Sequence, residues 1–176
     1  DYLVTEDDMK AIEDLQKRSL KEMDIRAVFI DGKRFSKHGV IVALGVASDG
    51  RKFVLGSYGA GAEDSSSCLA LLTDLESRGL PSSGLLFVVD GGSGLNKALN
   101  EKYRVHEKHN RRAIRIRCHV HKWWNLEKAL GDSAHKASGL FWALRDAKDM
   151  TEAKAISDRL ESVLQDLNRS ALASYL

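Results

Sequence analysis

The sequence is poor in cysteine and in long apolar runs. Its only cysteines, Cys68 and Cys118, are too few for a disulfide framework and predict a reducing, cytoplasmic setting. No apolar run approaches the roughly 20 residues that a membrane-spanning helix needs. The acidic start, DYLVTEDDMK, has neither the basic nor the apolar region of a signal peptide. We therefore expect a cytoplasmic protein without a membrane span.

The composition is that of a globular protein. Hydrophobic residues make up 43% of the 176 residues, which is enough for one domain with a real core and an extension. The net charge is +2, a balance that permits a nucleic-acid partner without arguing for one. The chain starts without Met and ends, at NRSALASYL, inside a helical pattern. From both ends we expect a fragment of a longer protein.

The first third of the chain predicts a helix followed by three strands. An amphipathic pattern, with Met9, Ile12, Leu15 and Leu20 on one apolar stripe, predicts a helix from residue 6 to about residue 24 in the N-terminal segment 1–24. The apolar run at 27–30 predicts a short buried strand. The segments 40–47 and 52–58 are rich in Val, Leu and Phe, and the Asp-Gly pair between them is typical of a hairpin. These three strands should form an antiparallel meander.

Two further strand and helix units follow the meander. Helical patterns at 63–78 and 93–103 alternate with an apolar strand at 85–89 and a strand at 113–117. The last strand, AIRIR, alternates apolar with basic residues as a half-exposed strand does. The remainder of the chain is helical in pattern. This order predicts an α/β fold with a mixed sheet flanked by helices, in a ribonuclease H-like topology.

An aspartate follows each of the two most apolar strands, Asp31 after AVFI and Asp90 after LLFVV. If these strands are parallel neighbours, the acids lie at adjacent C-terminal ends, about 4.8 Å apart in the sheet. Two carboxylates so placed repel, and a divalent cation such as Mg²⁺ removes the repulsion. Two such ions can clamp an in-line phosphoryl displacement. A strand-final Asp before Gly is also common in turns and helix caps, so that interpretation stays open.

Five segments together resemble a known family. FIDGKRF, VALGVASDGRKFVLG, LLTDLESRGL, LLFVVDGGSGLNKAL and RCHVHKWWNLEKAL are similar in order and spacing to the catalytic core of bacterial Mutator-type insertion-sequence transposases. The resemblance implies a ribonuclease H-like catalytic domain at residues 25–121 with an Asp-Asp-Glu triad and two Mg²⁺ or Mn²⁺ ions. It implies hydrolysis at a transposon end and strand transfer into target DNA, in a homodimer or larger complex. Asp31 and Asp90 match the first two acids and would be catalytic, metal-binding residues.

The third acid of the triad has no match in the sequence. In the family this glutamate lies beyond a helical insertion, and residues 122–176 resemble the start of that insertion. Glu127, Glu152 and Glu161 fall on helix faces and are expected to be solvated or ion-paired. We therefore expect the catalytic Glu beyond residue 176, and this chain to bind metal weakly and to cleave poorly or not at all.

The sequence CHVH offers further candidates around the site. Cys118 and His121 match the Cys-x-x-His motif of the family, which implies a site-supporting role. A structural zinc site needs four ligands, and no second Cys/His pair is spaced to complete one. Basic residues near the acids and the last strand could contact DNA phosphates, although a solvated strand face explains the arginines equally well. These DNA-contact candidates are Lys33, Arg34, Arg115, Arg117 and Lys122.

Two other functions are compatible with the residues. The first is a metal-dependent phosphohydrolase of a small substrate with Asp31 as nucleophile. Such enzymes usually carry a second Asp two residues on, where this sequence has Lys33. The second is a non-catalytic DNA-binding domain descended from a transposase.

Overall fold

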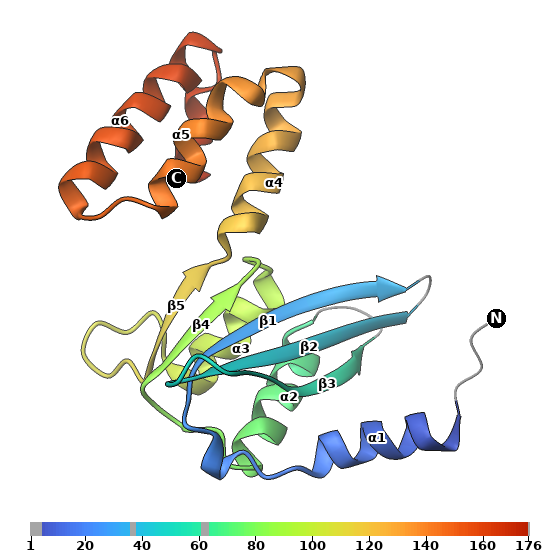
Figure 1. Ribbon diagram of the computed structural model, residues 1–176. Helices are drawn as coiled ribbons and strands as arrows, with labels where there is room; N and C mark the ends of the chain where they lie inside the picture. Colours follow the sequence, from blue (N-terminus) through green and yellow to red (C-terminus); the bar gives the residue numbers. More distant parts are fainter. Residues whose placement is uncertain (1–4, 36–37, 61–63, 176) are drawn as a thin grey trace. The chain divides into compact units, whose positions relative to one another are not determined.

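The computed structural model describes residues 5–35, 38–60 and 64–175 (Figure 1). The chain divides into two compact units, Asp1–Arg117 and Cys118–Leu176. The first unit contains a β-sheet with helices, and the second is helical. Within the described residues, no helix combines the length and the apolar character that a membrane crossing requires.

A mixed β-sheet forms the centre of the first unit. Its described strands are β1 (Ile25–Phe35), β2 (His38–Ala47), β3 (Lys52–Ala60), β4 (Leu85–Val89) and β5 (Ala113–Arg117). Their spatial order is β3-β2-β1-β4-β5. β2 runs antiparallel to β1 and β3, whereas β4 runs parallel to β1 and β5. The predicted meander is confirmed, and so is the parallel placement of the first and fourth strands.

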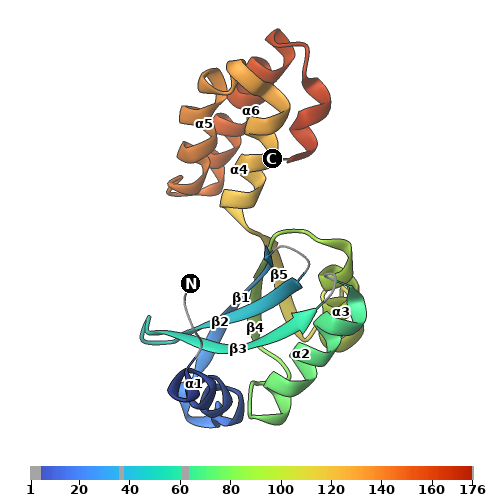
Figure 2. The same cartoon turned by 90° about the vertical axis from the view of Figure 1, so that its right-hand side faces the viewer.

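Two helices cover one face of this sheet, as Figure 2 shows. Helix α2 (Ser65–Ser77) begins after Asp64, whose carboxylate accepts a hydrogen bond from the Ser67 amide at 2.8 Å. Such a cap satisfies an amide that a helix start otherwise leaves unpaired. Helix α3 (Ser93–Tyr103) follows β4. Apolar residues of the helices pack against the sheet in one core, including Leu72, Leu75, Leu95, Leu99, Val28, Ile30, Phe87 and Val89.

The opposite face of the sheet carries an exposed apolar row. Strand register places Ile116, Val88, Phe29, Leu44 and Val54 side by side across the strands from β5 to β3. Phe29, Val54 and Ile116 are exposed by 41%, 44% and 46%. The strands β1 to β4 therefore present apolar side chains on both faces, which explains why they appear as apolar runs rather than as strict alternations. Strand β5 differs, because Arg115 and Arg117 lie on its other face.

The N-terminal helix is shorter than predicted. Helix α1 (Glu6–Lys17) ends well before residue 24, and a short 3₁₀ turn, η1 (Lys21–Met23), follows it. Asp24 closes this turn with a left-handed φ of 42°, a conformation that ends helical backbone. The predicted inward stripe is wrong for Met9 and Ile12, which are exposed, and right for Leu20, which is buried.

The second unit consists of three helices with short 3₁₀ turns. They are α4 (His119–Leu130), α5 (His135–Arg145) and α6 (Met150–Asp166), with η2 (Gly131–Ser133) and η3 (Ser170–Tyr175). Trp123, Leu126, Phe141, Leu160 and Leu164 form its buried core. Trp123 is therefore a core residue, as an apolar helix face predicts. Trp124, one position on, faces away and is exposed.

Candidate active site

The two predicted acids follow the last paired residues of β1 and β4. The parallel pairing of these strands ends with Ile30 opposite Val89, and Asp31 and Asp90 are the next residue on each. Neighbouring strands lie about 4.8 Å apart. The structure therefore places Asp31 and Asp90 each one residue beyond the last pair of two neighbouring parallel strands.

Strand β1 differs from the prediction at this point. It does not end at Ile30 but continues to Phe35, because β2 pairs with it through Asp31, Gly32 and Lys33. The first acid is thus a strand residue, held by the hairpin, while the second lies in the loop after β4. In contrast, the parallel pairing of β1 with β4 ends at Ile30 and Val89, one residue before the acids. Asp31 and Asp90 are both partly exposed.

Asp31 has a basic neighbour two residues along the same strand. Lys33 Nζ lies 3.3 Å from Asp31 Oδ2, and both side chains are substantially exposed, by 58% and 38%. An exposed ion pair of this kind contributes at most about 1 kcal/mol. A divalent cation at Asp31 can therefore displace the lysine at little cost.

The loop after β4 gives Asp90 a fixed setting. Asp90 Oδ1 accepts a hydrogen bond from the Gly92 amide at 2.8 Å. Between them Gly91 has a φ of +99°, and a Cβ at that position would lie 2.6 Å from Arg117 Nε. Only glycine fits this position without strain. The glycines after Asp90 therefore shape the loop that presents the carboxylate.

Three side chains from α3 and β5 hold this loop. Asn96 Nδ2 donates to the Gly91 carbonyl at 2.9 Å, and Arg115 Nη1 donates to Asn96 Oδ1 at 2.8 Å. Arg117 Nε donates to the Asp90 carbonyl at 3.2 Å. Asn96 was not among the residues predicted for the site. A signal was present, because asparagine is disfavoured inside helices unless its amide has a partner nearby.

The arginines of β5 differ in orientation from a simple half-exposed strand. Ile114 and Ile116 are the exposed residues, whereas Arg115 and Arg117 are half-buried and bond toward α3 and the Asp90 loop. The alternation of apolar and basic residues in β5 is compatible with either face turned inward. The arginines turn inward because Asn96 and the Asp90 carbonyl offer them hydrogen-bond acceptors. Both arginines, expected as DNA contacts, therefore have structural partners.

Comparison with known proteins identifies the family. A family model described as "Transposase, Mutator family" matches residues 3–176. The chain belongs to this family of transposases. It is also 33% identical over 107 residues to a protein of Acidithiobacillus ferrooxidans described as "Transposase for insertion sequence element IST2". That match covers 58% of the chain and 34% of the relative, so the chain spans about a third of that protein's length. The resemblance in the sequence is confirmed.

The Cys-x-x-His residues of this transposase chain belong to the second unit. Cys118 is half-buried and directly precedes α4, without a side-chain capping bond to it. The His121 ring contacts Trp124 edge-on, with ring centroids 4.9 Å apart. His119 stacks on Phe141 at 4.3 Å, and burial lowers the pKa of its imidazole. These contacts lie inside the second unit, and a site-supporting role for Cys118 and His121 stays a prediction.

The remaining basic candidates are distributed over both units. Arg34 lies in β1, but its side chain is outside the described part of the chain. Lys122 is half-buried in α4. In the first unit, Arg26, Arg111 and Arg112 line a hollow at the other end of β4 and β5 from the acids. Arginine side chains are well suited to bind phosphate, but Arg26 is already paired with Asp24 at 2.8 Å.

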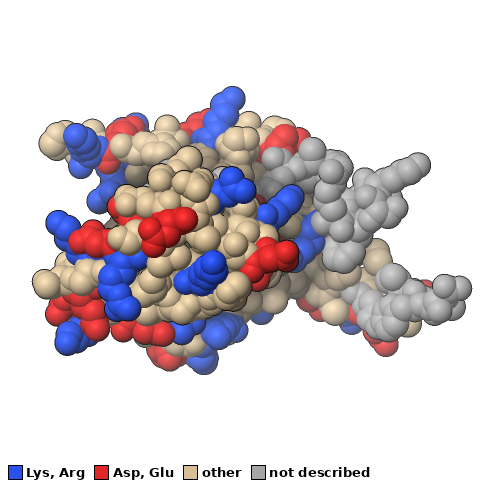
Figure 3. Space-filling view, turned by 90° about the horizontal axis from the view of Figure 1, so that it is seen from above, with Lys and Arg blue, Asp and Glu red and all other residues tan. Residues whose placement is uncertain are grey.

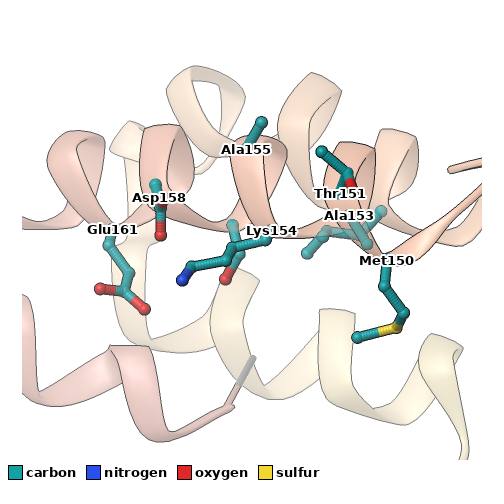
Figure 4. A pocket seen from close by; sticks show the side chains of 9 residues that line it. Met150, Thr151, Ala153, Lys154, Ala155, Asp158 and Glu161 are labelled. Carbon is teal, nitrogen blue, oxygen red and sulfur yellow. The ribbon is translucent and has the colours of Figure 1, made fainter.

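The surface in Figure 3 shows Lys and Arg side chains interspersed with Asp and Glu. Among the described residues on that face, basic side chains form no continuous track. A hollow along α6 has the same mixed character, with Lys154, Asp158 and Glu161 beside Met150 (Figure 4). Its charged residues follow one another at helical spacing, as on a solvated helix face. Neither surface carries a distinct chemistry.

The two acids are suited to hold a metal ion. Carboxylate oxygens on adjacent strands are the hard ligands that Mg²⁺ and Mn²⁺ take. Within residues 5–35, 38–60 and 64–175, no group of three or more His, Cys, Asp or Glu side chains is placed to bind one ion. Metal binding by Asp31 and Asp90 therefore stays a prediction, in which these two acids would supply two of the protein ligands.

Proposed function

We propose that this chain is part of the catalytic core of a DNA transposase, in which Asp31 and Asp90 hold the metal ions for phosphodiester hydrolysis and strand transfer. The main support for this proposal is the register of β1 and β4. Ile30 pairs with Val89, and an aspartate directly follows each of them. Family membership supplies DNA as the substrate class. The strand order β3-β2-β1-β4-β5 supports a ribonuclease H-like assignment of the fold.

The chain's own residues hold and orient the site in this proposal. Two carboxylates that lie close together repel each other in the absence of a cation. Asp31 and Asp90 would therefore form a strong pair of ligands for Mg²⁺ or Mn²⁺. When bound, a pair of such ions stabilises the attacking and leaving oxygens of a phosphoryl displacement. The Asp90 loop, bonded through Gly92, keeps one carboxylate oxygen turned toward its own main chain. The second oxygen then serves the cation.

The proposed catalytic site also involves residues other than Asp31 and Asp90. We assign residues 25–121 to the catalytic core and 122–176 to the beginning of a helical insertion. The glutamate that completes the triad would come from a segment beyond residue 176. The active complex would contain at least two copies of the protein on DNA, with Cys118 and His121 supporting the site and Lys33, Arg34 and Lys122 near phosphates.

Strand cleavage by the full-length protein tests the proposal. Asp31→Asn and Asp90→Asn should each abolish Mg²⁺-dependent cleavage of transposon-end DNA, because the amide loses the charge that binds the metal. Asp158→Asn, at an exposed position of α6, is the matched control and should cleave normally. Undiminished cleavage by either site variant contradicts the assignment.

The two rival functions predict different experimental results. A small-substrate phosphohydrolase would form a phospho-aspartate at Asp31, which the transposase proposal excludes. A non-catalytic descendant would bind DNA but would show no metal-dependent cleavage even as the full-length protein. The family match favours neither of them.

A further inference from the structure

The peptide group between Gly91 and Gly92 links Asp90 to a side chain outside the metal site. Its N–H, from Gly92, donates to Asp90 Oδ1 at 2.8 Å. Its C=O, from Gly91, accepts from Asn96 Nδ2 at 2.9 Å. A peptide group is planar, so its C=O and N–H turn together. Whatever fixes the Gly91 carbonyl therefore also aims the amide that orients the Asp90 carboxylate.

The Asn96 amide has only one orientation that satisfies its partners. Arg115 is a donor without acceptor capacity, so Asn96 must turn Oδ1 toward it. The Gly91 carbonyl is an acceptor, so Asn96 must turn Nδ2 toward that oxygen. A flipped amide would break both hydrogen bonds. Arg115 thus holds the asparagine in the state that binds the loop.

Both supports of this loop come from rigid elements. Asn96 follows the fully buried Leu95 near the start of α3, and Arg115 lies in β5, opposite Phe87 of β4. Arg115 Nη1 also lies 3.1 Å from His106 Nε2, which further restricts the guanidinium. Gly91 itself has no side chain and would turn easily without these contacts, since glycine populates both signs of φ.

We propose that Asn96 is a positioning residue that fixes the Asp90 carboxylate for metal binding by clamping the Gly91–Gly92 peptide. This inference rests on the proposed function of Asp90 as a metal ligand. The chain of contacts runs from Arg115 to Asn96, then to the Gly91 carbonyl, and through the shared peptide to Asp90 Oδ1. Asn96 itself does not touch the reacting groups in this scheme.

The substitution Asn96→Asp isolates the clamp. Aspartate has the same size and can still accept from Arg115, but it cannot donate to the Gly91 carbonyl and places an oxygen against it. Asn100→Asp, one turn along α3, is the matched control. Asn100 Oδ1 accepts from the His106 amide at 3.3 Å, and an aspartate there preserves this contact.

Two measurements on the 176-residue chain decide the question. Hydrogen exchange of the Gly92 amide, followed by NMR without metal, should be roughly tenfold faster in Asn96→Asp, the effect of removing one hydrogen bond. In a Mn²⁺ titration followed by electron paramagnetic resonance, half-saturation should shift to a roughly tenfold higher Mn²⁺ concentration, on the same grounds. Asn100→Asp should match the wild type in both. Equal Gly92 exchange in Asn96→Asp and wild type overturns the proposal.

The two readouts separate this inference from the proposed function. If the full-length wild-type protein binds no Mn²⁺, metal binding by Asp90 is contradicted, while the Gly92 exchange still tests the clamp. If exchange rises in Asn96→Asp but Mn²⁺ binding is unchanged, the contact is structural and the positioning role is wrong. Should Asn96→Asp not fold, Arg115→Met provides the same test, because it releases the Asn96 amide and should raise Gly92 exchange by a smaller factor.

Discussion

Ile30 of β1 and Val89 of β4 are partners in a parallel pairing, and an aspartate follows each of them. Both partners are buried against the helices, by exposures of 2% and 1%, so the core fixes the register. Because each acid directly follows one of these partners, the relative placement of Asp31 and Asp90 depends on that register. Stability of this core and function of the site are therefore linked through the same two strands.

The two faces of the sheet should respond differently to truncation. Ile30→Ala removes a core side chain and should lower the free energy of unfolding by about 3 kcal/mol. Ile116→Ala, on the face where Ile116 is 46% exposed, should cost less than about 1 kcal/mol. Urea unfolding followed by circular dichroism measures both. Equal effects would mean that the exposed row is buried in solution.

Arg78 should be a key stabilising residue of the first unit. Its guanidinium donates to the carbonyls of Leu15, Arg18 and Leu55 and pairs with Asp74, and its side chain is only 8% exposed. Arg78→Met leaves these acceptors unpaired and should cost about 2–4 kcal/mol of unfolding free energy. Arg51→Met, at an exposed pair, is the control in the same urea titration and should cost less than about 1 kcal/mol.

The second unit should lose stability as the pH falls through the range of histidine titration. Burial, with the nearby charges of Lys122 and Arg145, lowers the pKa of His119 below its ordinary 6.5, against a raising effect from the Phe141 carbonyl and Asp146. The folded unit then binds this proton less readily than the unfolded chain. Its contribution is present above pH 6.5 and is lost as the pH falls toward the lowered value.

Tryptophan fluorescence can follow this transition selectively. All three tryptophans, at positions 123, 124 and 142, lie in the second unit. The melting temperature from this signal should fall between about pH 7.5 and about pH 5, and His119→Gln should reduce that fall. His135→Gln, at an exposed position of α5, should leave the pH dependence unchanged. A fall of the same size in His119→Gln would assign the pH dependence to another group.

The arginine hollow at the far end of β4 and β5 should contribute to DNA affinity. The double substitution Arg111→Glu, Arg112→Glu should weaken binding to duplex DNA of any sequence. It should also reduce the slope of log affinity against log salt by about 0.9 for each phosphate that the protein no longer neutralises. Fluorescence anisotropy at several salt concentrations measures both quantities. The control Arg145→Glu, at a residue paired with Asp146 in the second unit, should change the slope less.

Much of the sheet could be predicted from local sequence. Continuous apolar runs identify central strands, and Asp-Gly identifies the β2–β3 hairpin, since both signals are contained in a few neighbouring residues. The crossover after the meander then suggests that β4 pairs with β1. From these inferences it follows that Asp31 and Asp90 come directly after paired residues of neighbouring strands, although neither aspartate alone is distinctive.

Features that depend on partners distant in sequence could not be predicted. The extension of β1 past Asp31 is set by pairing with β2, and the inward turn of Arg115 is set by Asn96 on another element. The exposure of Met9 and Ile12 depends on what α1 packs against, which periodicity does not contain. Asn96 gave only a general signal, an asparagine within a helical pattern, and its role becomes visible only when the Gly91 carbonyl is placed beside it.

The central claim is that Asp31 and Asp90 share a divalent cation. A crystal of the full-length protein containing Mn²⁺, measured at the manganese absorption edge, tests it most directly. We predict an anomalous peak about 2.0–2.2 Å from a carboxylate oxygen of each aspartate, with Lys33 displaced from Asp31. The account would be contradicted if a crystal saturated with Mn²⁺ showed manganese only at positions away from Asp31 and Asp90, with Lys33 still paired with Asp31.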